Sequence, residues 1–407
     1  AGPTCSPSRA ALLTGQAPHS SGMMGLAHRG WSLNDYSQHL LHTLRTAGYD
    51  SALCGTQHIA GHDVGGSEAI GYDQILETGN GTDHPNAVRE FFGQRAGNNT
   101  PFFLAIGFGE THRTATTSQN VQWHNGPASP MGDPRYVRPP ACLPDTPETR
   151  ADFADYRQCA HKLDAHYGRI LENLDRTGLA DNTLVIITTD HGLAFPHMKC
   201  HLTDHGIGVL MMMRPPECWS DTFKRGTVID PMVSHIDIFP TLCDLLDIEK
   251  PNWLQGESML PLLRGETDSI HDAVFSEVTY HGAYEPKRCA RTERYKYIRR
   301  FDVDQYPRHI MSNVDPSVSK DMLVEHGWWD RPRAAESLFD LVFDPNEANN
   351  IAQDPNMADV LADMRQKLDD WMARTDDPLR NGPVEPRPGD IVTPQDAYNP
   401  ADSVKIE

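Results

Sequence analysis

Two continuous apolar segments constrain the fold of this 407-residue chain more than any other feature. Residues 101–108 read PFFLAIGF, and residues 184–189 read LVIITT. A strand that is covered on both faces is apolar without alternation, so the run at 101–108 is typical of a buried parallel strand, and the run at 184–189 is the strongest strand signal in the chain. They predict an α/β fold, in which helices cover a central sheet.

Helical and strand-like segments alternate over the first two thirds of the chain, and the pattern then changes. Amphipathic spacing predicts helices over residues 36–47, 148–177 and 236–246. Short strands and one helix follow, at residues 274–278, 288–292, 295–299, 336–340 and 356–374. We therefore expect a large α/β domain over 1–268 and a smaller C-terminal α+β subdomain over 269–407, an antiparallel sheet plus a helix. The tail after Asp377 is either a wrapping arm or disordered.

The overall charge narrows the range of binding partners. A formal net charge of −20 argues against nucleic acid and anionic membranes, which require a basic face. No segment approaches the roughly 18 apolar residues that span a bilayer. A local cationic pocket can still capture a small anion, because buried charges act at short range.

The segment CSPSRAALLTG (residues 5–15) places a cysteine and an arginine at the start of a predicted helix. The N–H groups at a helix N-terminus bind oxyanions and lower the pKa of a thiol. Arg9, about one turn further on, adds a guanidinium that can bind a sulfate or phosphate oxygen. On these grounds alone, a buried structural cysteine before an ordinary helix explains the segment equally well.

A second polar group follows the apolar run at residues 184–189. Asp190 and His191 come at the carboxyl end of this predicted strand, where α/β sheets place their sites. Asp190 can ligate a hard cation, which prefers oxygen ligands. The alternative is an acidic turn after a strand.

Together these two segments resemble the type I sulfatases, the formylglycine-dependent family of the alkaline-phosphatase-like superfamily. The match is Cys-x-Pro-Ser-Arg followed by x-x-x-Leu-Thr-Gly. The resemblance implies a large mixed sheet flanked by helices, and conversion of Cys5 to formylglycine by a formylglycine-generating enzyme or an anaerobic maturase. A hydroxyl of the hydrated aldehyde would attack sulfur. Ca²⁺, with Mg²⁺ as the alternative, would be held by Asp190, His191 and the modified Cys5.

The same resemblance assigns further site residues. It implies that Arg9 and Lys199 contact the sulfate, that His58 lies beside the nucleophile, and that His112 protonates the leaving group. Thr56 stands where many family members have a lysine, which removes one positive charge. Family members usually take two more metal ligands from an Asp-Asp pair on a strand expected before residue 1, so we expect the N-terminus to be truncated.

Several segments are most similar to the N-sulfoglucosamine sulfohydrolase (sulfamidase) branch of the family and its bacterial relatives. They are residues 112–113, 143–152, 277–279, 369–371 and 376–378. The similarity implies substrate contacts by Arg113, Glu277 and Arg288, although charged residues on a strand can equally form a solvated face.

The expected activity is therefore removal of sulfate from a sulfated saccharide or another small sulfate ester, as in glycosaminoglycan degradation. Two alternatives stay open: hydrolysis of a phosphonate or phosphate ester, and a catalytically impaired binding protein, which Thr56 favours. Family resemblance also implies a periplasmic, extracellular or lysosomal location and allows a homodimer.

Overall fold

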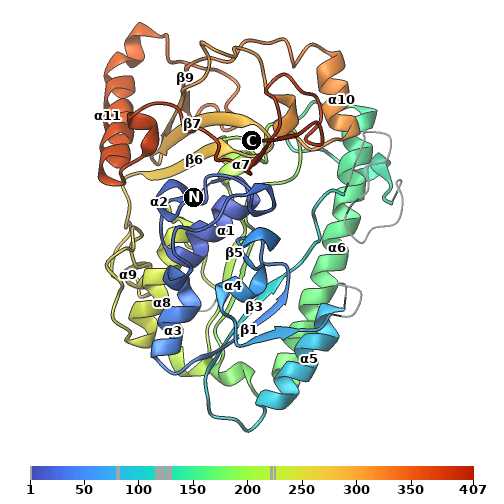
Figure 1. Cartoon of the computed structure of the whole chain (residues 1–407), viewed down its shortest axis with the longest axis vertical. Coiled ribbons are helices and arrows are strands. Elements are labelled where there is room, and N and C mark those ends of the chain that lie inside the picture. The colour runs from blue at the N-terminus through green and yellow to red at the C-terminus, as the bar shows by residue number, and fades with distance from the viewer. Residues whose placement is uncertain (1, 79–82, 115–122, 124–130, 221–222, 224–225) are drawn as a thin grey trace.

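The structure, a computed structural model, describes residues 2–78, 83–114, 123, 131–220, 223 and 226–407 (Figure 1). Its first sheet is parallel, with strand order β2-β1-β3. The strands are β1 (Asp50–Gly55), β2 (Gln74–Leu76) and β3 (Phe102–Gly107). β1 and β3 run in register from the pair Asp50 and Phe102 to the pair Gly55 and Gly107. Residues 101–108 thus form a parallel strand, as the sequence predicted.

Two long helices pack beside this sheet, α5 (His84–Arg95) and α6 (Pro147–Arg176) (Figure 1). Phe91 of α5 and Leu174 of α6 share an apolar cluster with Ala52 and Cys54 of β1. A second cluster brings together α3 (Leu40–Thr46) and α8 (Ile238–Leu246), with Phe103 of β3 against it. Helices of the large domain therefore cover the sheet, as expected for an α/β fold.

The second apolar run forms β4 (Val185–Thr188), which pairs only with β5 (Met211–Arg214) in the described residues, and antiparallel. The strand that the sequence predicted at residues 184–189 is therefore present, with an antiparallel partner. β4 is half-buried because it borders a cavity of about 1330 Å³, and β3 borders the same cavity. Apolar side chains therefore line the cavity as well as the core.

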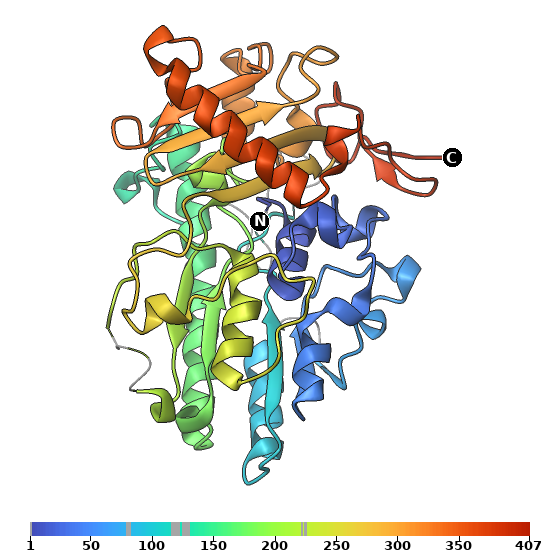
Figure 2. The ribbon, with the colours of Figure 1, turned by 90° about the vertical axis from the view of Figure 1, so that its left-hand side faces the viewer.

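The C-terminal region has the predicted antiparallel sheet and helix. The sheet has the order β6-β7-β8-β9. Its strands are β6 (Val274–Tyr280), β7 (Tyr284–Arg291), β8 (Tyr295–Arg300) and β9 (Glu336–Asp340). Leu368 and Trp371 of α11 (Ala358–Arg374) pack against Tyr297 and Leu338 of the sheet. Figure 2 shows this unit lying over the end of the large domain where the N-terminal segment runs.

The tail is a wrapping arm. Arg29 donates hydrogen bonds to the Thr393 hydroxyl (3.1 Å) and the Pro400 carbonyl (2.8 Å), and the Thr393 amide donates to Gly282. A short hairpin of β10 (Ile391–Val392) and β11 (Val404–Lys405) lies within the arm. Of the two predictions for the tail, the structure thus favours an ordered one.

The remaining α-helices are short. They are α1 (Cys5–Thr14), α2 (Pro18–Ser21), α4 (Ser67–Ile70), α7 (Asp204–Ile207), α9 (Leu260–Leu263) and α10 (Val318–Glu325). Among the described residues, none of the helices combines the length and the apolar character needed to cross a membrane.

Candidate active site

Cys5 is the first residue of α1, and its side chain is buried. Thr4 precedes it in an extended conformation, and its side chain makes no capping hydrogen bond to the helix. The first-turn N–H groups that are not used by a cap stay available to bind an anion at Cys5. Gly15 ends the helix with a φ of 68°, which glycine adopts without strain.

Asp190 and His191 follow β4 and face Cys5. The Nε2 atom of His191 lies 3.2 Å from the Cys5 sulfur, while its Nδ1 atom donates to the Gly192 carbonyl at 2.7 Å. Arg9 donates from Nε to Asp190 Oδ2 at 3.0 Å. We call Cys5, Asp190 and His191 the Cys5 cluster, because their ligand-type atoms all lie within 4.8 Å of one another.

The charges in this cluster shift one another's pKa values. Burial alone raises the pKa of Cys5, but the positive charges of Lys199 and His191, with hydrogen bonds from His112 and His191, hold it well below its usual value. Burial lowers the pKa of His191, but Asp190 and Cys5 outweigh it and raise that pKa to about 9. Opposed positive and negative groups of this kind are typical of functional sites.

His112 approaches Cys5 from the loop after β3. Its Nδ1 atom donates to the carbonyl oxygen of Arg113, so Nε2 is the ring atom left for the hydrogen bond to Cys5. Lys199 is buried, and its ammonium group donates to Asp315 Oδ2 at 2.9 Å. Burial lowers the pKa of Lys199, but the negative charges of Asp315 and Cys5 raise it above its usual value, so the side chain is cationic.

His58 lines the same cavity as Cys5 and stacks on His28, a residue that the sequence analysis missed. The Nδ1 atom of His28 lies 2.8 Å from Nε2 of His58. Burial, together with the charges of His58 and Arg29, lowers the pKa of His28 to about 4, so His28 is neutral near pH 7. Thr56, at the position where a lysine was expected, is exposed and also lines the cavity.

His235 is a second residue that the sequence analysis did not single out for the site. Its Nδ1 atom lies 3.1 Å from the Ser8 hydroxyl of α1, and its Nε2 atom lies 3.0 Å from the Thr188 hydroxyl of β4. This buried ring therefore connects the helix that carries Cys5 to the strand that precedes Asp190.

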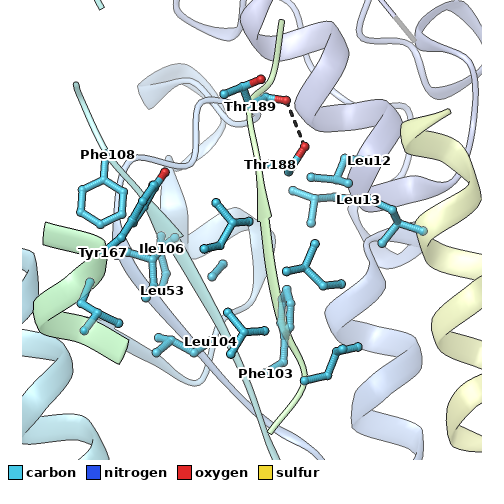
Figure 3. Close-up of a pocket in the computed structure, with 18 of the residues that line it drawn as sticks. Leu12, Leu13, Leu53, Phe103, Leu104, Ile106, Phe108, Tyr167, Thr188 and Thr189 are labelled. Carbon is cyan, nitrogen blue, oxygen red and sulfur yellow. Dashed lines mark hydrogen bonds between the residues drawn. The ribbon is translucent and has the colours of Figure 1, made fainter. Parts of the chain in front are cut away.

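The polar cluster lies at one part of the 1330 Å³ cavity, and the rest of the cavity wall is mainly apolar. Figure 3 shows Leu53, Leu104 and Ile106 on one side of β4, and Leu12 and Leu13 on the other. The cavity therefore brings an apolar wall directly up to the Cys5 cluster.

Three residues that the sequence analysis named as substrate contacts lie in buried ion pairs. The Arg113 side chain is buried, pairs with Asp152 at 2.7 Å and lies over the Trp123 ring. Arg288 is fully buried and pairs with Asp377, and Glu277 is buried and accepts hydrogen bonds from His19. None of the three lines the cavity at Cys5, and each pairs with an opposite charge inside the protein.

Comparison with known sequences identifies the family. Residues 1–248, more than half of the chain, match the sequence profile named Sulfatase. The chain belongs to the sulfatase family. Residues 197–328 of this sulfatase-family chain also match the profile named N-sulphoglucosamine sulphohydrolase, C-terminal.

Individual relatives agree with the family assignment. The sulfatase-family chain is 28% identical to human N-sulphoglucosamine sulphohydrolase, over 92% of this chain and 82% of that protein. It is 23% identical to the uncharacterized sulfatase YidJ of Escherichia coli K12, over 100% and 89% of the two chains.

Solved structures share the fold. A 2-O GAG sulfatase superposes with a TM-score of 0.68 at 22% identity, covering 95% of this chain and 85% of the other. A second structure, in complex with its substrate D-glucosamine-2-N,6-O-disulfate, gives a TM-score of 0.62 at 17% identity, covering 95% and 90%. The expected alkaline-phosphatase-like α/β fold with a smaller antiparallel unit is confirmed.

The sulfatase family generally uses formylglycine and a divalent metal, so the donor groups of this sulfatase-family chain can be tested against a cation. The Cys5 cluster converges as a ligand set would. It holds one carboxylate, one imidazole and one sulfur, whereas Ca²⁺ takes six to eight oxygen ligands. These three groups therefore supply only part of the ligand set that such a cation takes.

Proposed function

We propose that this chain releases sulfate from an ester or sulfamate group of a sulfated saccharide. The observation that carries the proposal is the position of Cys5, at the open N-terminus of α1 and within reach of His112, His191 and Lys199. The matches to the sulfatase and sulfohydrolase profiles support this choice among the activities that such a pocket could serve.

The nucleophile in this proposal is formylglycine made from Cys5, which would supply a hydrated aldehyde whose oxygen attacks sulfur. Arg9, Lys199 and the N–H groups of α1 are proposed to hold the sulfate oxygens, because all of them present positive charge or donors at Cys5. Asp190 and His191 are proposed to contribute ligands to the divalent cation, with Ca²⁺ expected and Mg²⁺ the alternative.

His112 is proposed to protonate the leaving nitrogen or oxygen. Its Nδ1 atom donates to the Arg113 carbonyl, so Nε2 faces Cys5 and can carry the proton that the leaving group needs. His58 is proposed to act beside it, with its ring held by His28 at 2.8 Å. A hydrogen-bonded partner fixes ring orientation, as a general acid requires.

The partners and location of the protein are proposed on the family resemblance. Activation requires a formylglycine-generating enzyme or an anaerobic maturase. A homodimer and a periplasmic, extracellular or lysosomal location stay predictions.

Thr56 favours one competing function, a catalytically impaired binding protein, because it leaves the pocket without a charge that many family members have there. Phosphate or phosphonate ester hydrolysis is the other alternative, because the same nucleophile can attack tetrahedral phosphorus. Both can be tested on protein that is co-expressed with a maturation enzyme.

The first measurement is mass spectrometry of the Cys5 peptide, in which we expect formylglycine. The second is release of sulfate and of phosphate from paired aryl esters, and of sulfate from N-sulfoglucosamine. We expect sulfate release to be faster than phosphate release. Unmodified Cys5 would point to the binding protein, and equal or faster phosphate turnover would point to a phosphoryl hydrolase.

A further inference from the structure

Asp315, an acidic residue of the C-terminal region, contacts Lys199 of the proposed active site and has no role assigned above. Asp315 lies between the 3-10 turn Met311–Asn313 and α10. Its Oδ2 atom accepts the hydrogen bond of the Lys199 ammonium at 2.9 Å, and the side chains of Asp315 and Lys199 are 13% and 4% exposed. An ion pair that is this well shielded from solvent constrains both partners more than a surface pair does.

The charge of Asp315 is set by its surroundings. Burial raises the pKa of Asp315, but the positive charges of Lys199, His112 and His281 lower it below its usual range. The carboxylate is therefore ionised, and it is bonded to the cation proposed to bind sulfate.

The loop that carries Asp315 is anchored on both sides. Lys320 donates to the carbonyl oxygens of Val314 (3.1 Å) and of Tyr398 in the C-terminal arm (2.7 Å). The Asn313 side chain accepts from the amides of Gly282 (2.9 Å) and Ala283 (2.8 Å) in the turn between β6 and β7. A side chain on a loop fixed in this way can orient a flexible partner.

Lys199 needs such a partner. A lysine carries its charge on a flexible four-carbon stem, so its backbone does not fix the position of the ammonium group. The backbone itself is held close to Cys5, because the amide of the next residue, Cys200, donates to the Pro3 carbonyl at 2.8 Å. What remains to be fixed is the side chain, and Asp315 is bonded to its end.

We propose that Asp315 is a positioning residue, which orients the Lys199 ammonium beside Cys5 and so makes the C-terminal region part of the active site. The inference rests on the proposed sulfatase function. Removal of a negative charge next to an anion site strengthens ground-state attraction for the anion, whereas loss of orientation weakens stabilisation of the transition state. The two effects therefore separate in KM and kcat.

The test compares Asp315→Asn, Lys199→Met, the double variant and Asp315→Glu, all matured in the same way. For Asp315→Asn we expect kcat for sulfate release to fall about tenfold or more, with KM and the inhibition constant of inorganic sulfate unchanged or lower. Asp315→Glu keeps the charge and should retain more activity than Asp315→Asn. In the Lys199→Met background, Asp315→Asn should lower kcat little further, because Asp315 acts by orienting Lys199.

A matched control is Asp302→Asn. Asp302 is buried, pairs with Arg333 at 2.9 Å and lies outside the proposed machinery. Its loss should lower the melting temperature without lowering kcat of the folded fraction.

The positioning role would be overturned by a wild-type kcat in Asp315→Asn. It would also be overturned if Asp315→Asn lowered kcat by the same factor with and without Lys199. If Asp315→Asn does not fold, the comparison of Asp315→Glu with wild type decides. Absence of sulfate release by the wild-type protein would instead contradict the proposed function itself.

Discussion

Two clusters in this molecule each combine a histidine and a carboxylate with a third potential metal ligand, and they differ in what surrounds them. One is the Cys5 cluster. The other is His19, Glu277 and Asp377, which we call the His19 cluster. In both, the ligand-type atoms lie within 4.8 Å of one another, so composition alone makes both candidate cation sites.

The His19 cluster is buried, and its carboxylates are already paired with the guanidinium of Arg288. Arg288 pairs with Asp377 through its Nε and Nη2 atoms and lies 3.3 Å from Glu277, and all of these side chains are buried. The His19 amide donates to Glu277 at 2.7 Å. The cluster joins the N-terminal segment, the C-terminal sheet and the tail, so it serves structure.

The Cys5 cluster is open on one side. Asp190 and His191 are half-buried and line the cavity, and Arg9 donates to Asp190. The difference between the two clusters is therefore access. In the His19 cluster, buried charges satisfy one another and stabilise the fold, whereas Asp190 and His191 border a cavity and remain available for a ligand.

The largest expected effect is the loss of sulfate release when the Cys5 cluster, and not the His19 cluster, is changed. Cys5→Ala removes the precursor of the nucleophile, so sulfate release should fall to background, on the order of 10⁴-fold or more. The free energy of unfolding should change far less than activity. Cys218→Ala, at an exposed cysteine, is the control and should be active. Measurable turnover by Cys5→Ala would contradict the assignment of the nucleophile.

Arg288→Ala should have the opposite profile. It leaves two buried carboxylates without their cation, so the free energy of unfolding should fall by about 3–5 kcal/mol. Urea denaturation measures the loss. Arg299→Ala breaks the more exposed pair with Asp369 and should lower the free energy of unfolding by no more than about 1 kcal/mol. A loss of kcat with unchanged stability would instead return Arg288 to the substrate site.

His112→Ala tests the side of the Cys5 cluster that faces the leaving group. We expect a loss of about 10²-fold or more for sulfamates and alkyl sulfates, which need a proton on departure. Activated aryl sulfates leave without that proton and should be slowed far less. Steady-state kinetics on the two substrate classes measures the difference, and equal losses would rule out the role of general acid.

The smallest expected effect is a gain. Thr56→Lys adds a positive charge at an exposed position on the cavity wall. At about 1 kcal/mol for such a contact in water, KM for an anionic substrate should fall about fivefold. Thr56→Gln, of similar length and neutral, is the control. A fall in activity with Lys but not with Gln would show that Thr56 has another use in this chain.

Much of the fold could be predicted from local pattern. The apolar run at 101–108 became β3, and the amphipathic segment at 148–177 became α6 within one residue at each end. The run at 184–189 was predicted as a strand, but its antiparallel partner could not be predicted, because apolar character is the same in a parallel and an antiparallel pairing. Which strand lies alongside depends on the rest of the chain.

The residues of the candidate site also fall into those that local sequence predicts and those that depend on tertiary contacts. The sequence alone determined Cys5 at a helix start and Asp190 with His191 after a strand, because these depend on residues a few positions apart. Only the tertiary structure decided that His28 contacts His58, that Asp315 contacts Lys199, and that Arg113, Glu277 and Arg288 lie in buried ion pairs. A charged side chain is equally charged at a site and in a buried ion pair. What distinguishes the two is the partner across the fold, which is 116 positions away for Lys199 and Asp315.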